Sequence, residues 1–434
     1  MHGFIGGKMS NIVDLHIGLD IGTSTSKVVI KPKYSTDNNY YLVDFGKYGI
    51  KNSTYLLPTA VVKKKNEVCL LKSNEKDGLV YRNLKIKYLK NPDNKNAQLL
   101  LCLYIALILK YAKKWFNDNY GMTDAYKNKI IKWTIHAGIP TKDHYDTKIS
   151  AYKKLIQHSL AIINKCETMD AAIYIHPEIY AAIQSYINRD NVKPEGFYGA
   201  IDVGAGTVDI AIFTIVAKED TGNLTYNTLG TDVKYIGANE YKGALLKVLR
   251  AYGYKERAKA LDRKFLLRNY IEEDKRMYCK GLPEERDIIE KMQKNEEKFK
   301  KTFWAQLGKV GIKRHNPNSP IFKKGEGKLP FFISGGGSNI SIYKTVINEM
   351  SKSMVHSYVN FKGIEIMDVD DTEVVSTCMT NINKLYTAVA IGLSSFDVSD
   401  ESEDKQYISP DRLKKVEIYA PVQNIKEAPT KDEC

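Results

Sequence analysis

Several features that would commit a chain to a disulfide framework, a zinc site or secretion are missing from this sequence. The six cysteines are scattered, with no C-x-x-C pair and no nearby histidine at metal-ligand spacing. This pattern argues against a zinc site and against disulfide crosslinks, and it favours a reducing compartment. The N-terminal segment MHGFIGGKMS has no apolar signal core. We therefore expect a cytoplasmic protein.

Long hydrophobic runs are also scarce. The apolar stretch LLLCLYIALIL, from Leu99 to Leu109, has the length of a buried core helix and is shorter than a bilayer span, which needs about 20 residues. The residues that follow, KYAKKWF, continue a helical pattern with charges on one side. This segment predicts a core helix and no membrane contact.

The charge balance is basic, with a formal net charge of +14, but the lysines are spread along all 434 residues. No zinc-finger spacing, basic zipper or aromatic RNA-binding signature accompanies them. Lysine, asparagine, isoleucine and tyrosine are abundant together, so a coding bias explains the lysines at least as well as a polyanionic partner. We therefore do not expect direct nucleic acid binding.

The chain length fits two large globular domains.

Glycine-rich corners mark three segments of the chain. Two are strand–turn–strand units, from Leu15 to Lys31 and from Tyr198 to Val216, and the third is an apolar strand that leads through three glycines into a helix, from Leu329 to Ile340. The first two share the order Asp-hydrophobic-Gly after a hydrophobic strand, at residues 20–22 and 202–204. This long-range repeat divides the chain into two comparable halves.

The repeat sets the expected domain organisation. We place the first domain at residues 14–196 and the second at 197–398, with the boundary in the polar stretch near 191–196. Between about 237 and 328 the sequence is charged and helical in pattern, which predicts a mostly helical subdomain inserted in the second half. Residues 399–434 predict a flexible or loosely docked tail.

The repeated corners have the composition of phosphate-binding loops. A glycine-containing turn between two strands leaves backbone N–H groups pointing one way, in a concavity suited to phosphate oxygens. The two loops contain Gly22, Thr23, Ser24 and Thr25 in the first half and Gly204, Ala205, Gly206 and Thr207 in the second. One such loop is weak evidence, because glycine-rich hairpins are common. Two that face each other from duplicated halves predict a phosphate site.

Acidic residues accompany both loops. Asp20 and Asp202 precede them at strand ends, where a carboxylate can hold the hydration shell of Mg²⁺, an ion that keeps most of its waters. An aspartate beside a glycine can also simply cap a turn, but that explains one of them and not the repetition. Asp209 is a further candidate for holding the waters of the metal. The alternating pattern of DIAIF, in which Asp209 is the first residue, equally allows it to be a buried structural carboxylate.

The three units resemble the phosphate-1, phosphate-2 and adenosine motifs of the actin, 70-kDa heat-shock chaperone and sugar-kinase superfamily. The likeness in order and spacing covers residues from about 14 to 398. It implies an α/β fold of two ribonuclease H-like, actin-like ATPase domains around a nucleotide cleft. It also implies that the cofactors are ATP and Mg²⁺ and that the activity is ATP hydrolysis.

Within that superfamily the sequence is most similar to the nucleotide-binding domain of the 70-kDa chaperones. LLPTAVV resembles a strand that starts with Pro-Ser there, and YRNLKIKYLKNP resembles a short helix with a catalytic lysine. This match implies that Lys87 faces the γ-phosphate. HAGIPTKDHYD resembles a Val-Pro-Ala strand end, and TYNTLGTDVKYIGANEYKGALL resembles a Gly-Gly-Glu-Asp helix start, with Gly237 and Glu240 in the corresponding places.

The resemblance also assigns the adenosine side of the site. IEEDKRMYCK is similar to a chaperone helix whose glutamate, lysine and arginine enclose adenine and reach ribose, which implies those roles for Glu272, Lys275 and Arg276. Cys279 stands where the chaperones have a serine that contacts the base. The same spacing is also typical of a solvated charged helix. The third corner, which contains Gly335, Gly336, Gly337 and Ser338, would let backbone approach the nucleotide, although a plain strand-to-helix corner is the alternative.

One departure from the chaperones concerns the water-orienting glutamate. The chaperones read Asn-Glu-Pro-Thr-Ala-Ala, whereas this chain reads IHPEIYAAI, so that Glu178 follows Pro177. This order resembles the Pro-Glu-Ser of plasmid-segregation actins. Glu178 remains the candidate for positioning water.

These motifs predict in-line attack of water on the γ-phosphate. Lys87 would offset charge, Asp202 and Glu178 would orient water, and Thr23 and Thr207 would donate hydroxyl hydrogen bonds. Too few residues follow residue 399 for the peptide-binding part of a chaperone. We therefore expect a stand-alone chaperone-like ATPase that closes on ATP, with or without a protein partner.

Two other functions remain open at this stage. One is an actin-like protein that self-associates into filaments to move plasmids, phage DNA or other cargo. The other is a small-molecule kinase, which needs an aspartate base beside a sugar pocket that we do not identify in the sequence.

Overall fold

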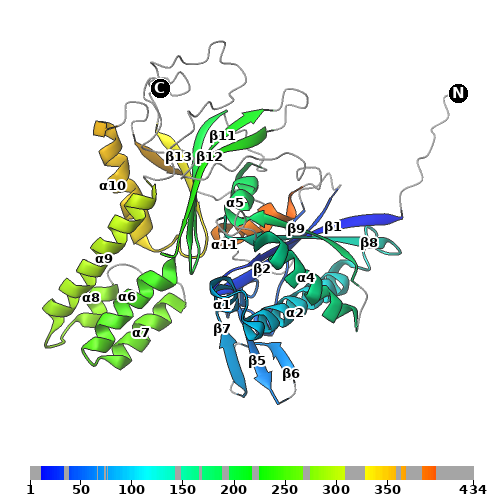
Figure 1. The fold of residues 1–434 in the computed structure, drawn as a ribbon, viewed down its shortest axis with the longest axis horizontal. Helices are drawn as coiled ribbons and strands as arrows, with labels where there is room; N and C mark the ends of the chain where they lie inside the picture. Colours follow the sequence, from blue (N-terminus) through cyan, green and yellow to red (C-terminus); the bar gives the residue numbers. More distant parts are fainter. Residues whose placement is uncertain are drawn as a thin grey trace, which may run out of the picture.

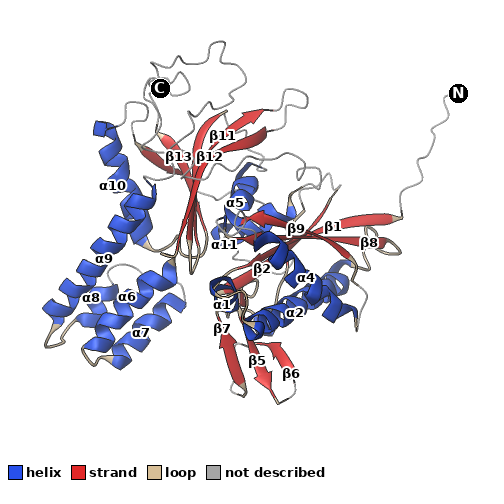
Figure 2. Ribbon diagram, viewed as in Figure 1, coloured by secondary structure: helices blue, strands red, loops and turns tan. Residues whose placement is uncertain are grey.

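Two mixed β-sheets, each covered by helices, make up the fold (Figure 1, Figure 2). The computed structural model describes residues 11–33, 39–65, 67–72, 75, 77–141, 148–165, 169–187, 195–217, 224–266, 274–307, 328–357, 363–367 and 384–396. The predicted domain boundary in residues 191–194 and the predicted tail, 399–434, lie outside these ranges.

The first sheet is built from the first half of the chain. Its strand order is β3-β2-β1-β8-β9, and the short strand β4 also pairs with β2. β1 is antiparallel to β2 and parallel to β8, which is parallel to β9. The strands are β1 (Ile12–Ile21), β2 (Thr25–Pro32), β3 (Tyr41–Leu42), β4 (Leu57–Pro58), β8 (Ile130–Ile139) and β9 (Ala171–Pro177).

The second sheet repeats this topology. Its order is β12-β11-β10-β13-β14, with antiparallel pairs on one side of β10 and parallel pairs on the other. Its strands are β10 (Gly196–Val203), β11 (Val208–Ala217), β12 (Leu224–Lys234), β13 (Leu329–Ser334) and β14 (Ile364–Met367). In both sheets the first strand lies in the centre, flanked on one side by the strand that follows it in the chain and on the other by a parallel strand from later in the chain, β8 or β13. The repeat read from the sequence is thus a repeat of strand order and direction.

Helices cover the outer face of each sheet because their apolar sides complete its core. α2 (Lys95–Tyr120) and α4 (Lys148–Asn164) share one buried cluster with β1 and β8. α6 (Ala238–Ala251), α9 (Glu285–Leu307) and α10 (Ser341–Ser357) share another with β10, β11 and β13. The apolar stretch 99–109 lies within α2 and confirms the predicted core helix. Among the described helices, none has the length and apolar character to span a bilayer.

Two further helices, α5 (Glu178–Ile187) and α11 (Lys384–Ser394), lie between the sheets (Figure 1). α11 packs on β1, and α5 packs on β10, while the two helices contact each other. These contacts require glycine: a Cβ on Gly18 would overlap the Ala390 carbonyl oxygen, and a Cβ on Gly392 would overlap that of Ala181. Backbone from both halves therefore meets in one central layer.

Two smaller elements extend from the sheets. α1 (Leu84–Lys90) lies beside a three-stranded sheet of β5 (Ala60–Lys64), β6 (Glu67–Leu70) and β7 (Leu79–Arg82). From residue 238 to 307 the described elements are all helices, including α7 (Lys255–Leu266) and α8 (Asp274–Cys279). The expected end of the helical subdomain, residues 308–327, lies outside the described ranges.

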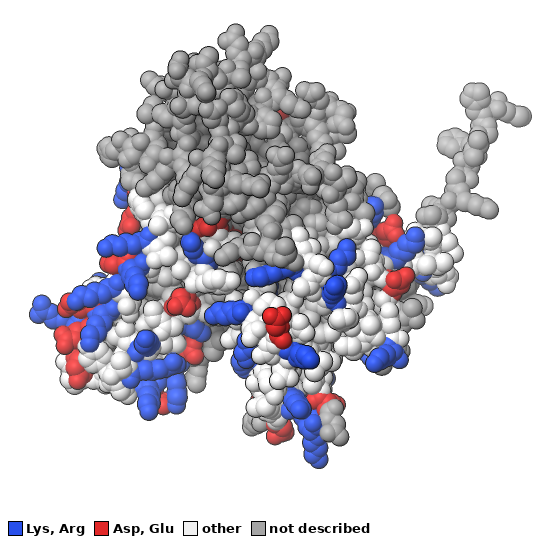
Figure 3. Space-filling view, viewed as in Figure 1, with Lys and Arg blue, Asp and Glu red and all other residues white. Residues whose placement is uncertain are grey.

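On the face shown in Figure 3, Lys and Arg side chains lie among Asp and Glu side chains on both halves of the molecule rather than in one patch.

Candidate functional site

A cavity of about 480 Å³ lies where the glycine-rich corners meet. Its volume is within the range of small-molecule sites. Its wall combines the strand ends of both sheets with the starts of α5 and α6, part of α11, and residues of the small sheet. The residues singled out from the sequence that line it are Asp20, Gly22, Thr23, Ser24, Thr25, Glu178, Asp202, Gly204, Ala205, Thr207, Gly335, Gly336 and Gly337.

The two repeated loops touch across this cavity. A Cβ placed on Gly206 would lie only 2.8 Å from the Thr23 Oγ1. Asn239 at the start of α6 donates a hydrogen bond from Nδ2 to the Ser24 Oγ at 3.1 Å. Loops from the two halves of the sequence therefore lie side by side, and glycine at 206 permits the approach.

The second loop is held from behind by the start of α6. The amides of Ala238 and Asn239 donate to the carbonyl oxygens of Gly204 and Ala205, at 3.0 and 2.8 Å. Gly237 allows this contact, because a Cβ there would lie 2.6 Å from the Gly204 oxygen. Gly237 thus supports the loop and does not line the cavity.

The third corner packs directly on the second loop. Gly335 has a φ of +88°, a left-handed conformation that favours glycine, and a Cβ there would lie 2.6 Å from the Asp202 Oδ1. The Gly337 amide donates to the Val203 carbonyl oxygen at 2.8 Å. Ser338 is buried behind this corner, where its hydroxyl donates to the Gly335 oxygen at 2.7 Å, and it does not line the cavity.

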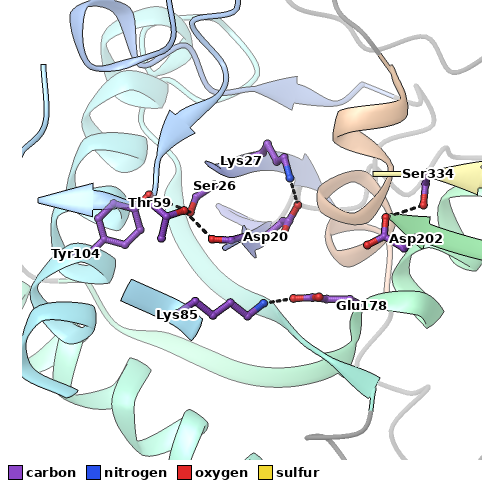
Figure 4. Close-up of polar contacts among 10 residues, drawn as sticks. Asp20, Ser26, Lys27, Thr59, Lys85, Tyr104, Glu178, Asp202 and Ser334 are labelled. Atoms are coloured by element: carbon purple, nitrogen blue, oxygen red, sulfur yellow. Dashed lines mark hydrogen bonds and ion pairs between the residues drawn. The ribbon is translucent and has the colours of Figure 1, made fainter. Parts of the chain in front are cut away.

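Two buried ion pairs lie on the first-half side of the cavity (Figure 4). The Lys27 Nζ lies 2.6 Å from the Asp20 Oδ2, and the Lys85 Nζ pairs with the Glu178 Oε1. Burial alone would lower the pKa of Lys85, but the charge of Glu178, its hydrogen bond, and the nearby Tyr152 and Asp20 together outweigh burial, so the net pKa is raised. Burial raises the pKa of Glu178 against the opposing charge of Lys85. Each carboxylate on this side therefore has its own ammonium partner.

On the second-half side, two buried carboxylates have neutral donors only among the described residues: Asp202 lines the cavity, and Asp209, its cross-strand partner, lies buried beside it without lining the cavity. Asp202 Oδ1 accepts a hydrogen bond from the Ser334 hydroxyl at 2.8 Å (Figure 4), and Asp209 Oδ1 accepts one from the Thr141 amide at 3.2 Å. The Asp209 Oδ2 has no hydrogen-bond partner among the described residues. Burial, together with the charges of Glu178 and Asp202, raises the pKa of Asp209 to about 8. This side of the cavity therefore attracts a proton or a cation.

The described residues contain no group of three or more His, Cys, Asp or Glu side chains arranged to hold a metal ion. A dedicated protein cage is the usual arrangement for zinc or calcium, whereas Mg²⁺ usually keeps several waters and takes one or two carboxylates together with substrate phosphate oxygens. Asp202 at the cavity wall, with the unpartnered Oδ2 of the buried Asp209 on the neighbouring strand, fits the Mg²⁺ pattern.

The lysine that α1 contributes to the cavity is Lys85, whereas the sequence indicated Lys87. Lys87 is exposed and does not line the cavity, whereas Lys85 is buried and does. In α1 the buried positions are Leu84, Lys85, Tyr88 and Leu89. The spacing of the apolar residues 84, 88 and 89 already places position 85 on the buried face and 87 on the opposite one. That signal identifies Lys85 without a structure.

The predicted adenosine helix does not contribute to the cavity as described. Arg276 on α8 is exposed and does not line the cavity, and Cys279 is buried in the core of the helical subdomain. Glu272 lies outside the described residues, as does the side chain of Lys275. The wall contains other residues that the sequence did not single out, among them Lys242, Asn339, Ile340, Leu385, Tyr386 and Val389.

No protein-family model matches this chain, and no curated protein matches it significantly. Interpretation of the site therefore depends on its own residues and on the repeated topology.

Proposed function

We propose that this chain binds ATP with Mg²⁺ in the cavity and hydrolyses ATP to ADP and phosphate. One observation carries the proposal: glycine-rich corners from two sheets of identical strand order touch at a single cavity lined by carboxylates and lysines. Turns of this kind offer amides to phosphate oxygens. A pair of them facing each other suits the several phosphate groups of one nucleotide.

The charges on the two sides fit magnesium triphosphate. Asp202 and Asp209 are the residues that would hold Mg²⁺, through its waters. When bound, this ion supplies neutralisation of charge on the phosphate oxygens. Asp209, buried with an unpartnered oxygen, gains a counterion in this arrangement.

Water attack on the γ-phosphate is assigned to residues from both halves. Lys85 takes the role that the sequence suggested for Lys87, because it lines the cavity from the same helix and pairs with Glu178. Glu178 orients the water, and its pairing with Lys85 holds both side chains in one geometry. Thr23 and Thr207 line the cavity and offer hydroxyl groups to the phosphates.

The nucleoside end fits the wall formed by Ile340, Leu385 and Val389, where the cavity is apolar. Apolar walls with a few polar groups are typical of small-molecule sites. Tyr386 supplies such a polar group, and its hydroxyl accepts a hydrogen bond from Asn339 Nδ2 at 2.7 Å.

The finer architecture belongs to the same proposal. We assign the two halves to ribonuclease H-like, actin-like ATPase domains, on the basis of their shared strand order and the α5–α11 layer between them. The output of such an arrangement is closure of the halves on ATP and relaxation on ADP, as in a stand-alone chaperone-type nucleotide-binding domain. We place this activity in the cytoplasm.

A filament-forming actin-like ATPase is the second candidate, favoured by the Pro177–Glu178 junction between β9 and α5, whose order matches the plasmid-segregation actins. Sedimentation with ATP, with ADP and without nucleotide separates the two. ATP-dependent pelleting supports filaments, and a monomer under all three conditions supports the chaperone-type ATPase.

The decisive experiment measures phosphate release and calorimetric binding of MgATP by the wild type, Asp202→Ala and Asp202→Asn. We expect both variants to lose turnover at least about a hundredfold, since they remove a charge that the transition state uses. Asp118→Ala, which changes an exposed carboxylate on α2, serves as the control with unchanged turnover. The proposal fails if the wild type gives no binding heat with MgATP, or if Asp202→Asn hydrolyses ATP at the wild-type rate.

A further inference from the structure

Thr59, which is not part of the cavity wall, holds two carbonyl groups of the first phosphate loop. Its hydroxyl donates to the Gly22 carbonyl oxygen at 2.7 Å. Its backbone amide donates to the Ser24 carbonyl oxygen at 2.9 Å. Thr59 is only 2% exposed, so water does not compete for either bond. One residue therefore fixes two alternate peptide groups of a four-residue loop.

The Thr59 hydroxyl is itself the end of a buried hydrogen-bond chain (Figure 4). Ser26 Oγ lies 3.0 Å from Thr59 Oγ1, and the Tyr104 hydroxyl lies 2.9 Å from Ser26 Oγ. Ser26 and Tyr104 are both fully buried. Tyr104 belongs to the middle of α2, so the chain runs from the core helix of the first half to the phosphate loop.

Counting the hydroxyl hydrogens gives this hydrogen-bond chain a single direction of donation. A hydroxyl has one hydrogen to donate, and Thr59 uses its own for Gly22, whose carbonyl can only accept. Thr59 must then accept from Ser26, and Ser26 must accept from Tyr104. Tyr104 keeps its proton, because burial raises its pKa further above the ordinary value. Its hydrogen is shared with the Pro58 carbonyl oxygen at 3.0 Å.

The direction of the carbonyls determines the direction of the amides. In a trans peptide the C=O and the N–H that follows it point to opposite sides. Holding the Gly22 carbonyl toward Thr59 turns the Thr23 N–H away from Thr59, and holding the Ser24 carbonyl does the same for the Thr25 N–H. Thr23, Ser24 and Thr25 line the cavity, whereas Thr59 does not.

We propose that Thr59, secured by Ser26 and Tyr104, is a positioning residue that turns the amides of the first phosphate loop toward the phosphates of the bound nucleotide. This inference rests on the proposed nucleotide site and adds to it a residue that never touches the ligand. Preorganised amides bind an anion without the cost of ordering the loop.

The test compares Thr59→Val, which keeps the shape and the amide but lacks the hydroxyl, with Thr59→Ser, which keeps the hydroxyl. Two quantities are measured: the Kd for MgADP by calorimetry, and amide hydrogen exchange of residues 22–26 in the nucleotide-free protein. We expect Thr59→Val to weaken MgADP binding about tenfold, the effect of one lost buried hydrogen bond, and to speed exchange in the loop. Thr59→Ser should stay within about twofold of the wild type in both.

Tyr104→Phe tests the far end of the chain and should weaken MgADP binding by about threefold. Tyr41→Phe is its matched control, because it removes another buried hydroxyl of the same half, bonded to the Tyr126 hydroxyl at 3.1 Å, and should leave the Kd unchanged. Equal Kd and exchange in Thr59→Val and Thr59→Ser would overturn the positioning role. Faster loop exchange in Thr59→Val, combined with no MgADP binding by the wild type, refutes the nucleotide proposal and leaves the role of Thr59 in orienting the loop intact.

Discussion

The two halves of the molecule share a topology and differ in charge at one equivalent pair of positions. In the first sheet the cross-strand partner of Asp20 is Lys27, and in the second sheet the cross-strand partner of Asp202 is Asp209. The lysine neutralises its carboxylate at 2.6 Å. The equivalent aspartate instead adds a second buried acid, whose pKa is raised to about 8. One side of the cavity is therefore internally paired, and the other depends on a ligand or a proton.

This difference shows how the two halves of a repeated fold can contribute opposite charges to one site. Lys27 and Lys85 come from the first half, line the cavity and can face phosphate oxygens. Asp202 comes from the second half, lines the cavity and can face a cation, and the buried Asp209 is its cross-strand neighbour. A nucleotide phosphate chain with its metal carries both signs. The charge asymmetry thus orients a magnesium nucleotide across the cavity, while the strand order of both halves supplies the same type of loop.

The largest expected effect on stability comes from substitutions at Lys27 and Asp209, the two equivalent positions. Lys27→Met leaves Asp20 buried without a partner, and we expect it to lower the free energy of unfolding by about 3–5 kcal/mol. Asp209→Asn removes a buried acid whose pKa is raised by burial and by neighbouring charges, a shift that costs folding free energy near neutral pH, and we expect it to raise the unfolding free energy by about 1–2 kcal/mol without magnesium. Urea denaturation in the presence of a chelator measures both.

The control for this pair is Lys114→Met, which breaks an exposed ion pair with Asp118 and should change stability by less than about 1 kcal/mol. If Lys27→Met and Asp209→Asn shift the unfolding free energy in the same direction, the two positions do not have opposite effects on stability, and the comparison of the halves is wrong.

A second prediction concerns the cationic side and turnover. Lys85→Met should lower kcat for ATP hydrolysis at least about a hundredfold, because the charge facing the reacting phosphate is lost. Lys87→Met, on the exposed face of the same helix, should keep the wild-type rate. Circular dichroism checks that Lys85→Met remains folded. Loss of turnover in Lys87→Met with normal turnover in Lys85→Met would restore the assignment made from the sequence.

The sequence predicts those parts of the fold and of the site that depend on local residue patterns. The strand–corner units, the repeat and the buried helix at residues 99–109 follow from local periodicity, and the structure confirms them. Motif likeness favours Lys87, whereas the apolar spacing of α1 favours Lys85. Position 85 lies on the buried face of this helix, and the spacing of the apolar residues alone identifies that face.

Other parts of the site could not be read from the sequence because they depend on tertiary contacts. Thr59 meets Gly22 across 37 residues and Tyr104 meets Ser26 across 78, and no local pattern connects them. The position of Arg276 depends on tertiary packing in the same way: it matches a motif, but its helix packs among the helices of residues 238–307, and Arg276 does not line the cavity.

The smallest expected effect concerns a second pair of equivalent positions. His136 is aligned with Gly18 in the first sheet as Phe332 is aligned with Ala200 in the second. Burial and the neighbouring His176 lower the pKa of His136 to about 2. A depressed pKa means that the stabilising neutral form is fully present above about pH 6.5 and that stability falls as the pH drops below it.

His136→Phe gives the first sheet the residue that the second already has, and it should remove this acid sensitivity. Between pH 7 and pH 5 we expect the wild type to lose about 1–2 kcal/mol more unfolding free energy than the variant, measured by urea denaturation at each pH. Replacing the exposed His158 on α4 by Gln should leave the wild-type slope unchanged. If the unfolding free energy depends on pH equally in the wild type and in His136→Phe, the buried imidazole stays neutral at no cost to folding over this range. The two sheets would then differ in charge only at the cavity.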